Sequence, residues 1–228
     1  MTQRGVRSIT VFHTDDDRRW YLEFLSEEID RFGVNILAWC LMTNHVHFIA
    51  VPHHETALAR AFGEAHRRYT RMKNFEEGVR GYLFQGRFSS VVLDESHLMA
   101  AARYVELNPV RAGIMDRAWE YPWSSAGFHT GVRVVDPLVK EKTLPTLAGN
   151  WREFLSDGDD KEVDALRMAT RTGRPASDEV FITVLSKIMG KNVMRGTRQA
   201  GEAAEETEMK NGIMSPDSPD SLTLHYSG

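Results

Sequence analysis

The sequence predicts an α+β fold: a ferredoxin-like sandwich of an antiparallel sheet with helices on one face, followed by a small helical C-terminal extension. Segments with strand and helix periodicity follow one another in the order β-α-β-β-α-β-α, which is typical of this fold class. The third and fourth segments are separated by only two residues, as in a β-hairpin. The 228 residues, 42% of them hydrophobic, suffice to bury one sizeable core.

The N-terminal part of the chain predicts one strand and one helix. Residues 6–11 contain four β-branched side chains and are expected to form a strand. Thr14 and the three aspartates that follow it are typical of a helix start, because the hydroxyl caps the first turn and carboxylates favour its positive end. Apolar residues then recur at helical spacing as far as Phe32, and Gly33 is expected to end the helix.

Two histidines lie in the predicted hairpin. The strongly apolar segment 34–42 and an alternating segment that ends at Pro52 flank the turn Thr43-Asn44. His45 and His47 are two residues apart in the second strand, so both imidazoles project from the same face, with Cα atoms roughly 6.6 Å apart. At that separation two ring nitrogens can bind one metal ion. The alternative is an edge strand that presents two histidines to solvent without any metal.

The middle of the chain predicts a second helix, a strand and a third helix. Thr56–Asn74 has apolar residues on one face, and most of its arginines lie elsewhere. Residues 88–93 are expected to form a short strand. Asp94 is a helix N-cap, a helical stripe of apolar residues follows it, and Pro109 is expected to end or kink the helix.

Tyr104 and Asn108 are four residues apart on the third predicted helix and therefore share a face. They lie at the edge of its apolar stripe, where both side chains can reach the sheet. A phenol can act as a nucleophile, and an amide oxygen can serve as a third metal ligand beside His45 and His47. Together the four residues suit phosphoryl transfer, in which a divalent cation polarises the phosphate that the phenol attacks. A packed aromatic residue and a helix-terminating asparagine are the structural alternative.

The chain beyond residue 112 gives weaker signals. Tyr121–Ser125 is expected to pack its aromatic residues onto the core, and residues 163–170 and 178–189 are expected to form two further helices. The segment from Gly196 onward is rich in Glu, Ser, Pro and Gly and predicts a disordered acidic tail. The expected organisation is a catalytic domain at 1–130, a helical extension at 131–195 and the tail at 196–228.

Composition excludes several classes of protein. A single cysteine excludes a disulfide framework and a cysteine-rich zinc module. The longest apolar run, residues 36–42, is far shorter than the roughly 18 residues of a membrane span, and the N-terminus has no secretory signal, so a cytoplasmic protein is expected. The net charge of −4 argues against a generic nucleic-acid binder. Residues 57–90 nevertheless carry seven basic against three acidic side chains, which favours either a phosphate-facing surface or a solvated helix face.

Two motifs resemble those of a known family. Residues 38–52, Ala-Trp-Cys-Leu-Met-Thr-Asn-His-Val-His-Phe-Ile-Ala-Val-Pro, resemble the HUH region of the single-tyrosine transposases, in which two histidines flank a bulky apolar residue. Residues 103–114 resemble the nucleophile helix of the same superfamily. Residues 84–88, 121–125 and 172–175 are similar to the branch called REP-associated tyrosine transposases. The resemblance extends from about residue 2 to residue 194.

The resemblance implies a metal-dependent endonuclease or transposase that acts on single-stranded DNA. Tyr104 would be the nucleophile, His45 and His47 would be metal ligands, and Asn108 would complete the metal site. Cleavage near palindromic hairpin repeats, with or without rejoining, would pass through a covalent 5′-phosphotyrosine intermediate and would need no ATP. The metal would be Mg²⁺ or Mn²⁺, and the partner would be single-stranded or hairpin DNA. The protein would be a monomer or homodimer, associated with the nucleoid when bound to DNA.

Several side chains near these motifs are expected to contact DNA. Arginines would bind phosphates, and aromatic side chains would stack on unpaired bases. The residues predicted to bind DNA are Arg4, Arg67, Arg68, Arg71, Gln85 and Arg87. The candidates for stacking are His66, Tyr82, Phe84 and Phe88.

Two other functions fit part of the pattern. A non-catalytic, domesticated protein that binds hairpin DNA would keep the same fold, although none of the motif residues looks degenerate. A zinc-dependent hydrolase would use His45 and His47, but such sites need a third histidine or a carboxylate close by, and Phe48-Ile-Ala follows instead. A covalent protein–DNA adduct that depends on Tyr104 separates these functions.

Overall fold

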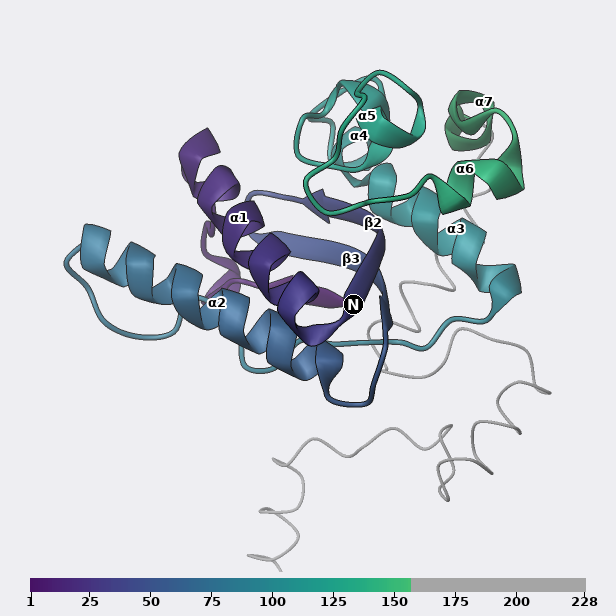
Figure 1. The fold of residues 1–228 in the computed structure, drawn as a ribbon. Coiled ribbons are helices and arrows are strands. Elements are labelled where there is room, and N and C mark those ends of the chain that lie inside the picture. Colours follow the sequence, from purple (N-terminus) through teal and green to yellow (C-terminus); the bar gives the residue numbers. More distant parts are fainter. Residues whose placement is uncertain (157–228) are drawn as a thin grey trace, which may run out of the picture. The chain divides into compact units, whose positions relative to one another are not determined.

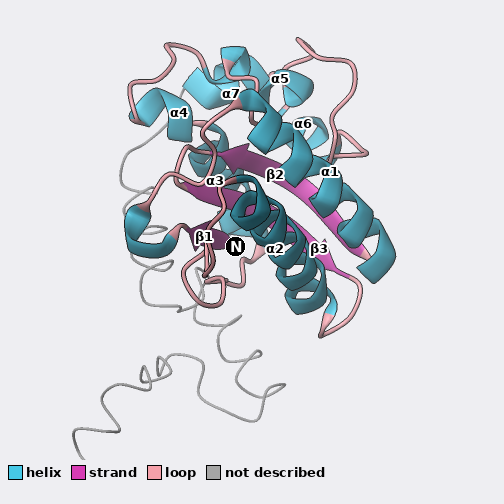
Figure 2. Ribbon diagram, turned by 90° about the vertical axis from the view of Figure 1, so that its left-hand side faces the viewer, coloured by secondary structure: helices cyan, strands magenta, loops and turns pink. Residues whose placement is uncertain are grey.

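The computed structural model describes residues 1–156, in which helices cover a small antiparallel sheet (Figures 1 and 2). The sheet contains β1 (Thr2–Arg4), β2 (Val34–Leu41) and β3 (His45–Pro52) in the order β1-β3-β2. Both neighbours of β3 run antiparallel to it. The predicted α+β class and antiparallel sheet are therefore confirmed, and β3 is the central strand.

Three long helices cover the sheet. α1 (Asp15–Phe32) and α2 (Ala57–Glu76) lie side by side on one face, and α3 (Glu95–Glu106) lies on the other (Figure 1). The prediction of helices on one face therefore holds for α1 and α2 but not for α3, because β2 and β3 present apolar side chains on both faces. The other helical segments of residues 1–156 are η1 (Val6–Ser8), α4 (Asn108–Arg111), η2 (Ala118–Glu120), α5 (Ala126–His129), α6 (Thr143–Ala148) and α7 (Trp151–Ser156).

The end residues of α1 set its limits as expected. The Thr14 hydroxyl accepts a hydrogen bond from the Asp17 N–H (3.1 Å), and the Asp17 carboxylate accepts one from the Thr14 N–H (2.9 Å), which is a capping box. Gly33 has a φ of +67°, a left-handed conformation that glycine adopts without strain, and it ends the helix. The chain enters β2 directly afterwards, so the end of α1 determines where the hairpin begins.

Backbone hydrogen bonds hold the β2–β3 hairpin at its turn. The N–H of Met42 donates to the carbonyl of His45 (2.8 Å), and the N–H of Gly5 donates to the carbonyl of Asn44 (2.9 Å). On the other side of β3, His45 is the register partner of Arg4 in β1. The two histidines therefore lie on the central strand and not on an edge strand.

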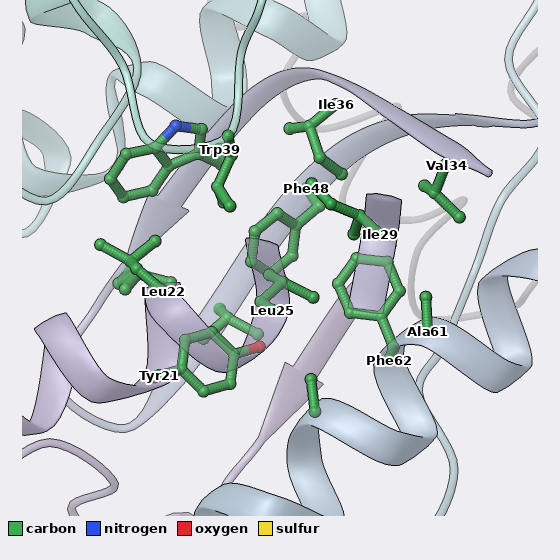
Figure 3. Close-up of a cluster of buried hydrophobic side chains, with 14 of the residues drawn as sticks. Tyr21, Leu22, Leu25, Ile29, Val34, Ile36, Trp39, Phe48, Ala61 and Phe62 are labelled. Carbon is green, nitrogen blue, oxygen red and sulfur yellow. The ribbon is translucent and has the colours of Figure 1, made fainter. Parts of the chain in front are cut away.

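The larger core lies between the sheet and helices α1 and α2 (Figure 3). Trp39 of β2 and Phe48 of β3 lie in it together with Leu25 of α1 and Phe62 of α2, and all four side chains are buried. The rings of Phe48 and Phe62 have centroids 5.0 Å apart. Burial of each such side chain contributes roughly 1.5–3 kcal/mol, which holds the hairpin against the two helices.

A second core lies between the sheet and α3. Ala38 and Ile49 of the sheet belong to the same cluster as Ala102 and Val105 of α3. The small side chains of Ala38 and Ala102 allow the helix to approach the sheet closely. His47 projects from the same face of β3 as Ile49, because alternate residues of a strand share a face. The histidine pair therefore faces α3.

The first strand differs from the prediction. Residues 6–11 were expected to form it, but Val6–Ser8 is a 3-10 turn and β1 precedes it. The N–H groups of Val11 and Phe12 donate to the carbonyl of Thr43 in the hairpin turn (2.9 and 3.1 Å), so this segment crosses the end of the hairpin. These tertiary hydrogen bonds override the strand preference of the β-branched residues.

The strand expected at 88–93 is not regular either. Ser89 pairs with Thr2 in an isolated bridge through two hydrogen bonds of 2.8 and 3.0 Å. The N–H of Gln85 donates to the carbonyl of Arg4 (2.8 Å). The segment 84–89 therefore runs along the free edge of β1, and β1, with three residues, is too short to support a longer ladder.

The chain after α3 follows the prediction as far as residue 125. α3 ends before Pro109, which lies in the first turn of α4. The Tyr121 hydroxyl donates to the carbonyl of Leu41 (2.8 Å), and the N–H of Ser125 donates to the carbonyl of Trp39 (3.0 Å). This segment therefore packs onto β2, as expected.

The remaining predictions for the C-terminal part concern residues beyond 156. The helices expected at 163–170 and 178–189 and the tail expected at 196–228 lie outside the described residues. The expected boundary at residue 130 lies within them, and Leu144, Trp151 and Leu155 pack into the same core as α3. Within residues 1–156, no helix is long and apolar enough to cross a membrane.

Candidate active site

Two imidazoles and a phenol meet on the α3 face of the sheet. His45 and His47 have ring centroids 4.9 Å apart, and the ring centroid of Tyr104 on α3 lies 5.7 Å from that of His47. Both pairs of rings are nearly perpendicular, at 85° and 86°. The structure therefore brings together the three residues that the sequence singled out from the hairpin and the third helix.

Asn44 orients the first histidine. The Nδ1 atom of His45 lies 2.7 Å from the Oδ1 atom of Asn44, and the Nδ2 atom of Asn44 donates to the carbonyl of Ser8 (3.2 Å). Because the amide nitrogen binds Ser8, the amide oxygen faces the ring, and the Nδ1–H group of His45 is the donor. The Nε2 atom then keeps its lone pair for a metal ion. The sequence pattern assigned Asn44 only to the turn. Its position directly before His45 is the feature of the sequence that could have indicated its contact with the imidazole.

Burial keeps both imidazoles neutral at pH 7. Burial, followed by the positive charge of Arg4, lowers the pKa of His45 to about 4. Burial also lowers the pKa of His47 well below its usual range, and neighbouring positive charges lower it further. A neutral imidazole has a free lone pair on one ring nitrogen, which is the form that binds metal ions. The pair is therefore in the metal-binding form at physiological pH.

The side chain of Asn108 binds the end of α3. Its Nδ2 atom donates to the carbonyls of Tyr104 (2.8 Å) and Val105 (3.3 Å), so the amide caps the last turn. These hydrogen bonds occupy the Nδ2 atom and leave the Oδ1 atom as the part of the amide that can bind a metal ion. Among residues 1–156, no group of three or more His, Cys, Asp and Glu side chains could hold a metal ion. A cation at the histidine pair would therefore need an amide or phosphate oxygen as well.

Arg111 lies beside Tyr104 and was not anticipated. Its guanidinium carbon is 5.4 Å from the centroid of the Tyr104 ring, and its Nη1 atom is 3.5 Å from the Tyr104 carbonyl oxygen. Arg111 follows Tyr104 by seven residues, about two helical turns. This spacing could have indicated that the two side chains lie on the same side of the helical segment. A guanidinium at this position is suited to bind a phosphate oxygen of a strand that reaches the phenol.

A small hollow contains part of this cluster. It has a volume of about 100 Å³ and is lined by His47 and Tyr104 together with Ser89 and Ser90, which precede α3. His47 is 8% exposed, and Tyr104 is half-buried. The volume is small beside the roughly 300–1,000 Å³ of pockets that enclose whole ligands. The hollow therefore admits only part of a substrate.

A buried carboxylate holds the end of α3 that carries the phenol. Glu106 has no exposed surface and accepts hydrogen bonds from Ser125 Oγ (2.5 Å), His129 Nδ1 (2.6 Å) and Trp151 Nε1 (2.7 Å). These donors belong to the segments around α5 and α7. Because Glu106 is two residues from Tyr104, the three hydrogen bonds fix the position of the phenol relative to the sheet.

Comparison with known families agrees with the motifs. Residues 7–108 match the family model described as "Transposase IS200 like". The predicted resemblance to the single-tyrosine transposases is confirmed over this span. The span includes the histidine pair, Tyr104 and Asn108, so every residue of the candidate metal site and the candidate nucleophile lie within the transposase match.

A solved structure also resembles the chain. It is described as "Structure of the REP associates tyrosine transposase bound to a REP hairpin", and it is 16% identical over 63% of this chain and 84% of that chain, with a TM-score of 0.49. No match to a curated protein was found.

Two of the residues predicted to bind DNA lie beside the histidine pair. Arg4 is exposed and is the register partner of His45. Gln85 is also exposed, and its N–H donates to the Arg4 carbonyl (2.8 Å). The structure therefore places both residues at the edge of the sheet, next to the candidate active site of the transposase-like segment.

The other four predicted DNA-binding residues lie on α2 and on the loop that follows it. Arg67, Arg71 and Arg87 line a groove of about 1050 Å³ between the helix and the loop. Arg68 lies outside this groove and contributes to a second hollow on α2. Arg67 and Arg68 form ion pairs with carboxylates of α1 and α2, which partly neutralise their charges.

Of the aromatic residues expected to stack on bases, Tyr82 is the one with a largely exposed ring, at 90%. Phe84 is buried, and His66 stacks on it with ring centroids 4.1 Å apart. Phe88 is half-buried and packs against the core. These three rings belong to the core or cover it, so they offer little surface to a base. Phe75 is 91% exposed at the end of α2 and was missed.

Proposed function

We propose that the chain is a metal-dependent transposase or endonuclease that cleaves single-stranded DNA beside hairpin repeats through a covalent 5′-phosphotyrosine. The observation that carries the proposal is the position of the Tyr104 ring, 5.7 Å from that of His47 on the α3 face of the sheet. The match of residues 7–108 to the IS200-like transposases supports a DNA strand exchange as the class of reaction.

The residues at the site fit a divalent cation. His45 and His47 are neutral at pH 7, their rings lie 4.9 Å apart, and the hydrogen bond to Asn44 leaves the Nε2 atom of His45 unprotonated. With the Oδ1 atom of Asn108 they would provide two nitrogen ligands and one oxygen ligand. Mn²⁺ suits the imidazoles, and Mg²⁺ suits the oxygen of the amide and of a substrate phosphate. When bound, the ion polarises the scissile phosphate.

Tyr104 supplies the nucleophile. Its hydroxyl oxygen attacks the phosphorus atom, a bond forms between the two, and the bond from phosphorus to the 3′ oxygen breaks. The phenol loses its proton to solvent and the departing 3′ oxygen takes one up, so the cut strand ends in a 3′-hydroxyl. The 5′-phosphate stays on Tyr104. Attack by a 3′-hydroxyl on this phosphotyrosine reverses the exchange, and one phosphoester replaces another at every step.

The same proposal assigns phosphate contacts to basic and polar residues around the site. Arg4 and Gln85 lie beside the histidine pair, and Arg111 lies beside the phenol, so both ends of the scissile segment have donors nearby. The full set of proposed DNA-binding residues is Arg4, Arg67, Arg68, Arg71, Gln85 and Arg87. The similarity of segments 84–88 and 121–125 to REP-associated transposases supports a hairpin repeat as the substrate.

A covalent-adduct assay with the full chain tests this function. A pool of labelled single-stranded oligonucleotides, each a short hairpin with randomised flanks, is incubated with Mn²⁺ or Mg²⁺ and separated under denaturing conditions. The unmodified protein is expected to form an adduct that survives denaturation. Tyr104→Phe is expected to form none and to keep hairpin binding, whereas Tyr82→Phe, at an exposed tyrosine, is the control that keeps the adduct.

Two outcomes would contradict the proposal. Undiminished cleavage by the Tyr104→Phe protein would exclude the phenol as nucleophile and favour a zinc-dependent hydrolase. Hairpin binding by the unmodified protein, without an adduct under either metal, would favour a non-catalytic DNA-binding protein.

A further inference from the structure

The groove of about 1050 Å³ lies between α2 and the loop that follows it. In Figure 1 the chain leaves the end of α2, turns back and runs alongside the helix. Asn74 holds this loop, because its Nδ2 atom donates to the Gly81 carbonyl (2.9 Å) and its own carbonyl accepts from the Val79 N–H (3.0 Å). Gly81 has a φ of +128°, which other residues rarely adopt. The sequence of the loop therefore maintains the groove.

Two aromatic side chains line the groove without belonging to the core. Phe75 is 91% exposed and Tyr82 is 90% exposed. The neighbouring rings of His66 and Phe84, by contrast, stack on each other, and Phe84 is buried. Exposed aromatic rings beside a groove are suited to stacking on nucleic-acid bases, since every base has a π-face.

The groove is lined by positive charge. Its four arginines are Arg67, Arg71, Arg80 and Arg87, and none of its lining residues is acidic. Arg67 is paired with Glu64, whereas the other three form no ion pair with any residue in the range 1–156. The chain as a whole has a net charge of −4, so this concentration of cations is local. A polyanion complements it better than an acyl chain or an uncharged peptide would.

One short segment connects the groove to the candidate active site. Arg87 and Phe88 line the groove, and the next two residues, Ser89 and Ser90, line the hollow that contains Tyr104. An extended chain advances about 3.3 Å per residue, so the groove and the hollow are close together along this segment. A strand that lies in the groove can therefore continue past Ser89 toward the phenol.

From these observations we propose that the groove binds an unpaired segment of single-stranded DNA. Bases stack on Phe75 and Tyr82, while Arg71, Arg80 and Arg87 bind the phosphates. The identification of the strand as single-stranded DNA rests on the proposed function. The groove would be a second binding site for this strand, separate from the hollow in which the strand is cut. Because stacking tolerates every base, this site holds the strand with little sequence preference.

Fluorescence anisotropy with a labelled thymidine strand of about 12 nucleotides tests the groove. The full chain carries Tyr104→Phe throughout, so that no strand is cut. Phe75→Ala and Tyr82→Ala are each expected to weaken binding by roughly 5- to 100-fold, and Tyr82→Phe is expected to retain it. Val134→Ala is the matched control, because Val134 is 88% exposed and lies outside the groove. All of these side chains are exposed, so the variants are expected to fold.

The salt dependence of binding tests the arginines. Arg71→Gln and Arg80→Gln are each expected to reduce the slope of log affinity against log salt concentration by about 0.7, the value for one phosphate contact on a single strand. Arg117→Gln, at an exposed arginine outside the groove, is expected to leave the slope unchanged.

Different outcomes would overturn the proposal for the groove and the proposed function. Unchanged binding of the thymidine strand by the Phe75→Ala/Tyr82→Ala double variant would overturn the groove, whether or not the unmodified protein forms an adduct. Binding that depends on the groove, without any adduct in the Tyr104 protein, would support the groove and overturn the proposed function. Equal affinity for a blunt duplex of the same length would overturn base stacking. Binding of neither nucleic acid would overturn the groove and favour a protein ligand.

Discussion

The phenol ring of Tyr104 lies almost perpendicular to the imidazole of His47, with 86° between the ring planes and 5.7 Å between the centroids. His47 belongs to the central strand, and Tyr104 belongs to the helix on the second face of the sheet. Their distance therefore depends on how α3 packs against β3. Any change that moves the helix therefore also changes the distance between the phenol and the histidine pair.

His47→Ala is expected to weaken the binding of Mn²⁺ by more than about 100-fold. Loss of a residue that only orients a metal ligand typically costs about 10- to 100-fold in affinity, and loss of the ligand itself is expected to cost more. Isothermal titration calorimetry measures the affinity, and chelation of the metal is expected to abolish the covalent adduct until Mn²⁺ is restored. His54→Ala is the control, because His54 is exposed outside the site. Equal Mn²⁺ affinity in the His47→Ala protein would show that the metal binds elsewhere.

Asn44→Ala is expected to weaken Mn²⁺ binding by about 10- to 100-fold, because the Nδ1 atom of His45 loses the acceptor that fixes its tautomer and ring orientation. Asn44→Asp keeps an acceptor at that position and is expected to retain most of the affinity. The same calorimetric titration compares the two proteins. If both bind Mn²⁺ as the unmodified protein does, Asn44 has no part in positioning the ligand.

Glu106→Ala is expected to lower the free energy of unfolding by about 3–5 kcal/mol, because it leaves the buried donors of Ser125, His129 and Trp151 without their acceptor. Urea denaturation measures the change. Glu120→Gln, at an exposed glutamate, is the control and is expected to change it by less than about 0.5 kcal/mol. A comparably small effect of Glu106→Ala would mean that the end of α3 is held by other contacts.

The stability of the protein is expected to fall as the pH drops below about 6.5, because burial lowers the pKa of His66 to about 3. Between these two values the unfolded chain binds a proton that the folded protein excludes, so the free energy of unfolding decreases with decreasing pH, by up to about 1.4 kcal/mol per pH unit. Urea denaturation between pH 7 and 5 measures the slope.

His66→Phe is expected to reduce this slope without abolishing it, because the pKa values of His45 and His47 are also lowered by burial and act in the same direction. The phenylalanine retains stacking on Phe84, so the variant is expected to fold. Equal slopes in the two proteins would show that His66 is protonated in the folded state as readily as in the unfolded chain.

The parts of the fold that the sequence predicted are those with local signals. Helix ends are set by residues within one turn, so the sequence alone predicts them. Examples are the capping box at Thr14, the left-handed Gly33 and the N-cap Asp94. The form of residues 6–11 and 88–93 depends on Thr43 and on β1, which lie far away in the sequence. The apolar stripe of α3 indicated a buried helix but not which face of the sheet it covers.

The candidate site divides in a similar way. The two-residue spacing of His45 and His47 and the family motif around Tyr104 were sufficient to name the three residues that lie together. Asn44 and Arg111 became visible only through their contacts in three dimensions. Phe84 was expected to stack on bases, but its side chain is buried. The prediction was wrong because composition does not distinguish the wall of a groove from the core beneath it.

The indole of Trp151 reaches Glu106 from a helix forty-five positions downstream of it. A fragment cut at residue 130 would remove this donor, together with the buried side chains of Leu144 and Leu155, from the core beneath α3. A fragment that ends at residue 130 is therefore expected to hold α3 less firmly than one that retains residues 144–155.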